Sequence, residues 1–152
     1  MRNRNVKIYI RDGRSPVPIN EHVSRTMSAI QSRNTGPELL ARKLLRVNAI
    51  KGFETHLRYV PGRPDIAFKK TKTAVFIHGC YWHGCPYCRL QLPKTHRDFW
   101  KKKIEANKLR DARKNRELRR LGWRTVTVWA CRLKTESRKR RVLSRIRTAF
   151  RR

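Results

Sequence analysis

The sequence predicts a single α/β domain in which a small mixed β-sheet is flanked by helices. Short apolar runs typical of strands alternate along the chain with longer amphipathic runs typical of helices. The 152 residues leave room for one core with tails, and the hydrophobic 38% includes four Trp, four Tyr and five Phe. No apolar run approaches the roughly 18 residues that a membrane span needs. The N-terminus lacks the apolar core of a signal peptide, so we expect a cytoplasmic protein without membrane contact.

The first third of the chain predicts an arm and two helices. Residues 1–20 carry scattered charges with Pro and Gly and show no periodicity, which predicts a basic N-terminal arm. Residues 23–30 (VSRTMSAI) have the spacing of a short amphipathic helix. Thr35 and Glu38 then have the spacing of a capping box, which predicts the start of a second helix. We expect Gly52 to end that segment.

Four short runs predict strands. Apolar and polar residues alternate over residues 53–59, which predicts a half-buried strand. A Pro-Gly-Arg-Pro turn at 61–64 precedes a second strand over 65–68. Residues 74–78 (AVFIH) form the most apolar short run and therefore predict a central strand, and residues 125–131 (TVTVWAC) predict the last one.

Two further helices complete the predicted architecture. A long helix is expected from about Asp98 to Leu121, where Gly122 stops it. Apolar residues at helical spacing also predict a basic C-terminal helix within residues 134–152. The chain is therefore expected to consist of a basic arm over 1–20, a core domain over 21–133 and a basic C-terminal helix over 134–152.

The charge balance indicates a polyanionic partner. Forty Lys and Arg residues face ten Asp and Glu, so the formal net charge is +30. That is about one excess positive charge for every five residues, and such a chain repels itself unless it binds a polyanion. Nucleic acid is the commonest polyanion in a cell, so we expect a nucleic-acid-binding protein.

The cysteine spacing indicates a metal site. Three cysteines lie within nine residues and a fourth is distant. A protein without an export signal is expected in a reducing compartment, which argues against two disulfide bonds. Four thiolates suit tetrahedral zinc, so we favour a structural zinc site over four free thiols. The ligands are Cys80, Cys85, Cys88 and Cys131.

One carboxylate and two imidazoles could support chemistry at strand ends. Asp65 begins a predicted strand and His78 ends the next one, so the two side chains can lie a few ångströms apart. His83 could curl back over the same place. A carboxylate, a strand-end carbonyl and water suit Mg²⁺, and an imidazole can accept a proton from water. The alternative is a turn aspartate capped by Arg63, beside two ordinary loop histidines.

Residues 27–131 resemble the very-short-patch-repair (Vsr) mismatch endonucleases. PGRPD followed by HGCxWH is a specific combination, and the matching stretches keep the family's order over about two-thirds of the chain. These stretches are MSAIQSRNTGPE (27–38), PGRPDIAF (61–68), AVFIHGCYWHGC (74–85), FWKKKIEANKLRD (99–111) and GWRTVTVWAC (122–131).

The resemblance implies a restriction-endonuclease-like core related to the PD-(D/E)xK nucleases. It implies an enzyme that nicks duplex DNA beside a T:G mismatch by water attack on a phosphodiester, with catalytic Mg²⁺ and structural Zn²⁺. We accordingly expect a bacterial protein that acts as a monomer on mismatched DNA, with other mismatch-repair proteins as further partners.

The resemblance also assigns catalytic roles by position. Asp65 would be the metal-binding carboxylate, and Ile77 would offer its backbone carbonyl to Mg²⁺. His78 would stand where the wider nuclease pattern has a lysine, and His83 would be the general base or its positioner. Glu38 matches a glutamate near the family's active site, although its role in the capping box explains it equally well.

Contacts to DNA are implied by a second group of residues. Tyr81 and Trp82 match an aromatic pair that wedges into the duplex, and Trp100 matches a third aromatic residue of that group. Without the resemblance, the pair could pack over the zinc loop and Trp100 could belong to the core. Lys103 and Asn107 would offer donors to base edges from one side of the long helix, with Ile104 and Leu118 expected opposite; a solvated charged face is the alternative. Met27, in the first matching stretch, completes the expected DNA-binding set.

Three departures from the family pattern stand out. Ile77 replaces a threonine, the metal cluster contains only cysteines where better-known members mix in histidine, and the basic termini have no counterpart. Two other functions therefore stay open. One is a zinc-stabilised basic nucleic-acid-binding module without catalysis, and the other is a restriction or mobile-element endonuclease of the same fold.

Overall fold

The computed structural model describes residues 17–18, 20–29, 33–88 and 90–151. Most of the expected N-terminal arm lies outside these residues. Residues 1–30 and 31–152 form two separate compact units. The first contains helix α1 (Glu21–Ser28), in the region where the sequence predicts a helix. No helix among the described residues is long and apolar enough to cross a membrane.

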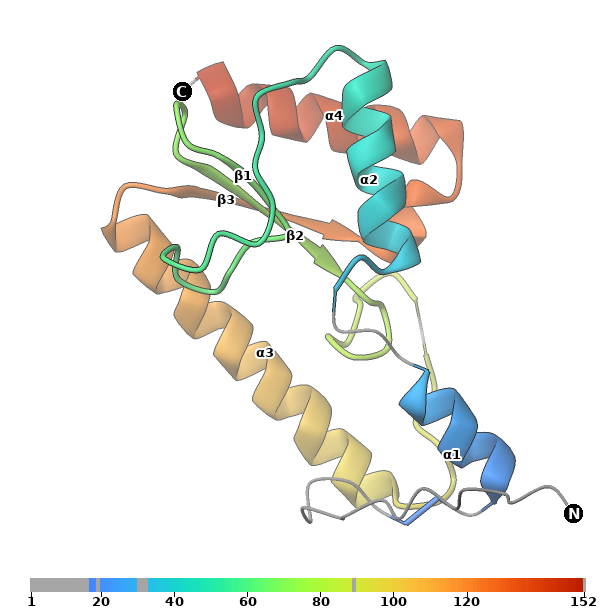
Figure 1. Ribbon diagram of the computed structural model, residues 1–152. Helices are drawn as coiled ribbons and strands as arrows, with labels where there is room; N and C mark the ends of the chain where they lie inside the picture. The colour runs from blue at the N-terminus through green and yellow to red at the C-terminus, as the bar shows by residue number, and fades with distance from the viewer. Residues whose placement is uncertain (1–16, 19, 30–32, 89, 152) are drawn as a thin grey trace, which may run out of the picture. The chain divides into compact units, whose positions relative to one another are not determined.

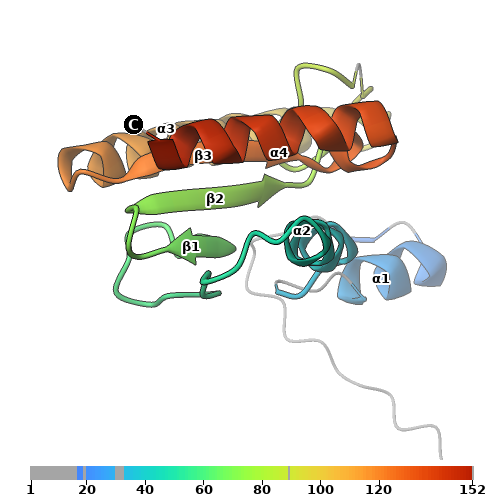
Figure 2. The same ribbon diagram turned by 90° about the horizontal axis from the view of Figure 1, so that it is seen from above.

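The second unit contains a mixed sheet, as the sequence predicts, with three strands in place of the four expected. Its strands are β1 (Ile66–Phe68), β2 (Thr73–His78) and β3 (Arg124–Trp129). β2 lies between the other two, antiparallel to β1 and parallel to β3 (Figures 1 and 2). All six β2 residues are buried, which confirms the prediction of a central strand.

Helices cover both faces of this sheet. They are α2 (Gly36–Val47), α3 (Arg97–Arg120) and α4 (Glu136–Arg151), and a 3₁₀ helix, η1 (Ala130–Leu133), links β3 to α4. Figure 1 shows α2 and α4 on one side of the sheet and α3 on the other. The long helix and the C-terminal helix therefore form where the sequence predicts them.

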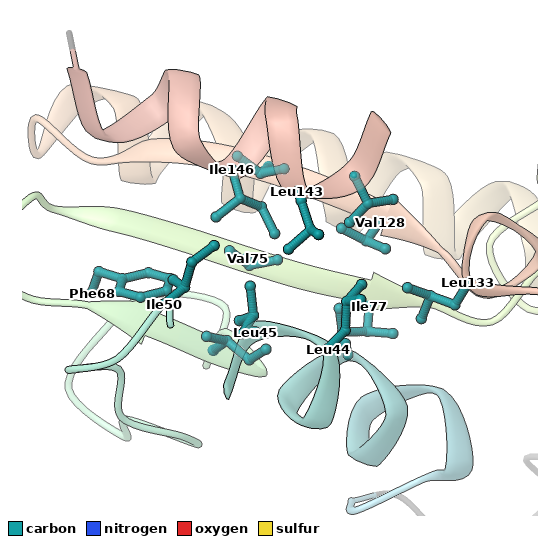
Figure 3. Close-up of a cluster of buried hydrophobic side chains, with 14 residues drawn as sticks. Leu44, Leu45, Ile50, Phe68, Val75, Ile77, Val128, Leu133, Leu143 and Ile146 are labelled. Atoms are coloured by element: carbon teal, nitrogen blue, oxygen red, sulfur yellow. The ribbon is translucent and has the colours of Figure 1, made fainter. Parts of the chain in front are cut away.

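Alternate strand residues point to opposite faces and build two apolar clusters. On one face, Val75 and Ile77 of β2 pack with Leu45 of α2 and Leu143 and Ile146 of α4 (Figure 3). On the other face, a smaller cluster surrounds Leu118 of α3. α4 is thus part of the main core, and its charged side chains lie along its outer side.

The predicted strand over residues 53–59 is wrong. Only Glu54 pairs with the sheet, through an isolated bridge to Ala67. His56 has a φ of 55°, which interrupts any extended run. The alternating residues do not share a face, because Phe53 packs on Phe68 while Leu57 belongs to the smaller cluster. The alternation arose from an irregular segment that contacts two cores.

The prediction that Asn107 and Leu118 lie on opposite sides of α3 is also wrong. Asn107 and Leu118 are the buried residues of this helix. They lie about three helical turns apart and so point the same way. One stripe of α3 therefore faces the protein, at its middle through an amide and near its end through a leucine.

Candidate active site and metal centre

The end of the central strand brings Asp65 and His78 to one cavity, as the sequence predicts. Asp65 directly precedes β1, and its Oδ2 accepts the backbone N–H of Ile77 at 2.6 Å. This contact ties the carboxylate to the neighbouring strand. The cavity is about 130 Å³ in volume. Its lining includes Asp65, Ile77, His78, His83, Asp111 and Lys114.

Two histidines stack above this cavity, and a carboxylate from α3 joins them. The rings of His78 and His83 are 4.0 Å apart between centroids and inclined by 14°. Asp111 Oδ2 lies 2.5 Å from His83 Nδ1 and 3.9 Å from His78 Nε2. Asp111 lies one turn after Asn107 and therefore on the same side of α3, but its sequence position alone indicates no role. Its partners lie far away in the sequence, so only the fold reveals the contact.

Burial changes the proton affinities of two residues in this cavity. Removal from solvent raises the pKa of Asp65 to about 6, against the opposing effect of the Ile77 N–H, and the charge of Glu38 raises it further. Burial and the neighbouring His83 lower the pKa of His78 to about 4. A buried carboxylate beside a second carboxylate gains stability from a nearby cation, which relieves both costs.

Glu38 is buried beside Asp65 and is held by donors from three residues. Its carboxylate accepts the backbone N–H of Asn34 at 2.9 Å, the Thr35 hydroxyl at 2.9 Å and Arg42 Nη2 at 3.1 Å. The first two bonds stabilise the start of α2, in a variant of the expected capping box in which Asn34, rather than Thr35, gives its N–H. Glu38 therefore serves the helix terminus and lies at the site at the same time.

Arg42 links this carboxylate to a histidine that the sequence analysis missed. Its Nη1 donates to Asn34 Oδ1 at 2.7 Å, and its Nη2 lies 3.0 Å from His56 Nε2. Ligand atoms of Glu38, His56 and Asp65 all lie within 4.8 Å of one another. Arg42 thus sits behind a potential metal-binding group and balances part of its negative charge.

We expect Arg42→Met to destabilise the protein by about 3–5 kcal/mol, because it leaves the buried Glu38 without its charged partner. Urea denaturation measures this change. The exposed Lys43 on the same helix provides the control, and Lys43→Met should stay within about 0.5 kcal/mol of the parent. Glu38→Gln combined with Arg42→Met should recover part of the loss. If Arg42→Met and Lys43→Met are equally stable, the ion pair between Arg42 and Glu38 does not contribute to stability.

The four cysteines gather as the sequence predicts. Their Sγ atoms all lie within 4.8 Å of one another, with Cys80, Cys85 and Cys88 in the loop after β2 and Cys131 in η1. Cys85 Sγ and Cys131 Sγ are 3.7 Å apart. This is far beyond a disulfide bond of about 2.05 Å. It matches the edge of a tetrahedron of sulfurs about 2.3 Å from a central zinc ion.

Neighbouring groups support this thiol cluster. Burial is the larger cause, and hydrogen bonds with the neighbouring thiols the smaller one, that together raise the pKa of Cys131 to about 12. The backbone N–H of Tyr87 donates to Cys85 Sγ at 3.4 Å, and the Arg132 guanidinium stacks 3.7 Å from the centre of the Tyr87 ring. Four thiols packed this closely form a donor set that a soft divalent cation satisfies.

The three aromatic residues expected at DNA form one half-buried cluster. Centroid distances are 5.2 Å for Tyr81–Trp82, 5.7 Å for Trp82–Trp100 and 6.0 Å for Tyr81–Trp100. The Tyr81 hydroxyl is buried without a hydrogen-bond partner among the described residues. The loop after β2 and the first turns of α3 supply this cluster.

The other expected DNA contacts lie in different environments. Lys103 is exposed. Asn107 is only 6% exposed, and its amide donates to the Trp82 carbonyl at 2.7 Å and accepts a hydrogen bond from Arg110. These contacts hold the loop after β2 against α3, so they do not support a direct base contact by Asn107. The side chain of Met27 lies outside the described part of the chain.

Comparison with known proteins identifies the class to which this arrangement belongs. The family model for the DNA mismatch endonuclease Vsr matches residues 18–89. The type II nicking enzyme V.XorIIP of Xanthomonas oryzae pv. oryzae is 45% identical over 108 residues, covering 70% of this chain and 78% of that protein. V.NmeAIP, a type II nicking enzyme of Neisseria meningitidis, is 41% identical over 81% of this chain and 87% of its own.

A third relative carries the family's name. The DNA mismatch endonuclease Vsr of Escherichia coli is 36% identical over 111 residues, which is 73% of this chain and 70% of that protein. These are endonucleases, so the comparisons favour an enzyme over a basic binding module without catalysis. The chain belongs to the Vsr family of DNA mismatch endonucleases.

Proposed function

We propose that this protein is a Mg²⁺-dependent endonuclease that nicks one strand of duplex DNA beside a T:G mismatch. The observation that carries the proposal is the cavity where Asp65 meets the stacked His78 and His83. Family membership supplies the class of reaction, and the Escherichia coli relative, a DNA mismatch endonuclease by name, supplies the mismatch. In this proposal residues 21–133 form a restriction-endonuclease-like domain, residues 1–20 a basic arm and residues 134–152 a basic helix.

Asp65 and the backbone carbonyl of Ile77 would hold Mg²⁺, which prefers oxygen ligands. Bound there, Mg²⁺ supplies Lewis-acid stabilisation of the charge that develops on the scissile phosphate. The fit rests on the donor set, because Asp65 is a buried carboxylate close to Glu38. Glu38 already accepts three hydrogen bonds from protein donors. It therefore adds negative charge beside the ion and keeps its position through Arg42.

His83 would accept the proton of the attacking water. Its Nδ1 faces Asp111 Oδ2 at 2.5 Å, so the carboxylate fixes a tautomer that carries hydrogen on Nδ1. Nε2 then presents its lone pair to water, as a general base requires. His78 has a pKa lowered to about 4 and so stays neutral near pH 7, which avoids a second positive charge against the stacked ring.

The remaining residues would bind DNA and hold the loop after β2. Zn²⁺ bound by the four cysteines would fix this loop to η1, and with it Tyr81 and Trp82. These two residues and Trp100 would enter the duplex at the mismatch, where unstacking costs least. Lys103 is exposed and can reach DNA, whereas Asn107 would act by positioning the loop. The many Lys and Arg side chains behind the net charge of +30 would contact phosphates, and such contacts add affinity without sequence information.

A second candidate function follows from the more similar relatives. Several relatives more identical to this chain than the Escherichia coli protein, V.XorIIP and V.NmeAIP among them, are named type II nicking enzymes. A nicking enzyme of that kind would use the same catalytic residues and select its site by surrounding sequence. The two candidates therefore differ in substrate and share their chemistry.

A nicking assay separates these functions. Purified protein is incubated with a T:G duplex, the matched T:A duplex and the single strand, each with Mg²⁺ and with EDTA. We expect nicking of the T:G duplex alone and only with Mg²⁺. Equal nicking of the T:A duplex would favour the sequence-selective nicking enzyme. Tight DNA binding without nicking of any substrate would overturn both.

A further inference from the structure

Helix α3 brings a lysine into the cavity that the proposed function does not yet use. Lys114 lies one turn after Asp111, so both side chains project from the same side of the helix. It lines the cavity together with Asp65, His78 and His83. Lys114 therefore shares one cavity with the residues to which the proposed function assigns the chemistry.

The ammonium group of Lys114 is not committed to another side chain. Among residues 33–88 and 90–151 it has neither an ion pair nor a hydrogen bond. Asp111 is engaged by His83, and Asp65 is engaged by the Ile77 N–H. A half-buried cation without a partner, in a cavity that serves a nuclease, suits an anionic substrate group.

The turn before β1 fixes the direction of this side chain. Gly62 has a φ of +77°, and a Cβ placed there would lie 3.2 Å from Lys114 Cδ and 3.3 Å from Lys114 Cβ. The same Cβ would lie 3.2 Å from the Phe76 ring. The absence of a side chain at Gly62 therefore leaves room for the lysine stem. Apolar packing holds the stem while the charged head stays free for a ligand.

We propose that Lys114 is a catalytic residue that hydrogen-bonds a non-bridging oxygen of the scissile phosphodiester. This inference rests on the proposed nicking activity and adds a residue to it. During attack, the water oxygen forms a bond to phosphorus while His83 accepts the proton of the water. The bond from phosphorus to the leaving sugar oxygen breaks, its electron pair stays on that oxygen, and solvent protonates it. Negative charge grows meanwhile on the non-bridging oxygens. Lys114 stabilises that charge and neither gains nor loses a proton. A compact ammonium group is suited to this task because it donates in three directions.

The test compares Lys114→Met with Lys114→Arg in the full-length protein. Methionine keeps the stem and removes the charge, whereas arginine keeps a cation. Single-turnover nicking of a T:G duplex at saturating protein should fall by roughly a hundredfold or more in the methionine variant. Arginine should restore part of the rate. DNA affinity should change only a few-fold, because one cation among forty is lost.

Lys102→Met is the matched control, since Lys102 is an exposed lysine on the same helix outside the cavity. A second readout uses substrates in which sulfur replaces one non-bridging oxygen of the scissile phosphate. Each stereoisomer reports on one oxygen, so sulfur at the oxygen that Lys114 contacts should slow nicking by the parent. Lys114→Met should lose this slowing and keep any slowing by sulfur at the oxygen that faces Mg²⁺. A merely structural role for Lys114 would leave the effect of sulfur unchanged for both stereoisomers.

The outcomes distinguish this inference from the function on which it rests. If the parent and the Lys102 variant nick DNA and Lys114→Met nicks at the same rate, Lys114 has no catalytic role and the proposed function stands. If Lys114→Met is slow but sulfur slows both stereoisomers as much as it does in the parent, direct phosphate contact by Lys114 is overturned. If the parent nicks none of the substrates, the proposed function fails first and this inference with it.

Discussion

Replacing Asp65 by asparagine is expected to slow nicking of a T:G duplex by about a hundredfold or more, the scale seen when a preorganised charge-stabilising element is lost. Asn keeps the volume of the side chain, and its Oδ1 can still accept the Ile77 N–H now bound at 2.6 Å. What disappears is the anionic oxygen that would hold Mg²⁺. Single-turnover kinetics at saturating protein measure the effect.

Binding and folding should survive this change. The carboxylate is half-buried and lies close to Glu38, so its negative charge is costly in the folded protein. Neutralising it should leave stability unchanged or higher. DNA affinity should hold or rise, because a negative charge near the phosphates is gone.

Asp98→Asn is the control for this experiment, since Asp98 is an exposed carboxylate in the first turn of α3. It should nick at the parent rate. An Asp65→Asn protein that folds, binds mismatched DNA and nicks as fast as the Asp98 variant would remove Asp65 from the mechanism. The choice between Asp65 as catalytic carboxylate and Asp65 as turn residue is then settled directly.

Local patterns predicted those parts of the fold that local energetics decide. β2 was predictable because a strand buried on both faces is apolar throughout. The long helix was predictable because its length and its stop at Gly122 are written in neighbouring residues. The false strand at 53–59 shows the limit, since its alternation is genuine but His56 bends the backbone out of the extended region. The residue types around His56 do not predict that bend.

The residues of the candidate site also fall into two groups, those that local sequence patterns predict and those that only the fold brings together. Asp65, His78 and the four cysteines were found because strand ends and cysteine spacing are visible in one segment at a time. Asp111, Arg42 and Lys114 were missed because each acts through partners on other elements. A weak signal did exist for Asp111, since it shares a helix side with Asn107. Residue types on that side of the helix are polar, so they do not favour a buried side over a solvated one.

Replacing Cys131 by serine is expected to remove the bound zinc and lower the melting temperature by about 10 °C or more. Zinc binding contributes to folding free energy, with apparent values of roughly 10–16 kcal/mol in small zinc-finger peptides. This chain also has a core, so we expect a smaller loss of about 4 kcal/mol, which corresponds to that shift for a domain of this size. Cys131 is the cysteine of the cluster that lies in η1, which leads through Leu133 to the main core, whereas the other three lie in the loop after β2.

Elemental analysis and calorimetry of the parent, Cys131→Ser and Cys85→His proteins test this expectation. Histidine can bind zinc, so Cys85→His should keep one metal ion per chain and lose little stability. A strong chelator should lower the melting temperature of the parent toward that of Cys131→Ser and leave the serine variant almost unchanged. This comparison separates the metal from the cost of burying a serine hydroxyl, since that cost is the same with and without chelator. Parent protein that contains no zinc, or that melts at the same temperature in chelator, would show that the four thiols hold the loop by packing alone.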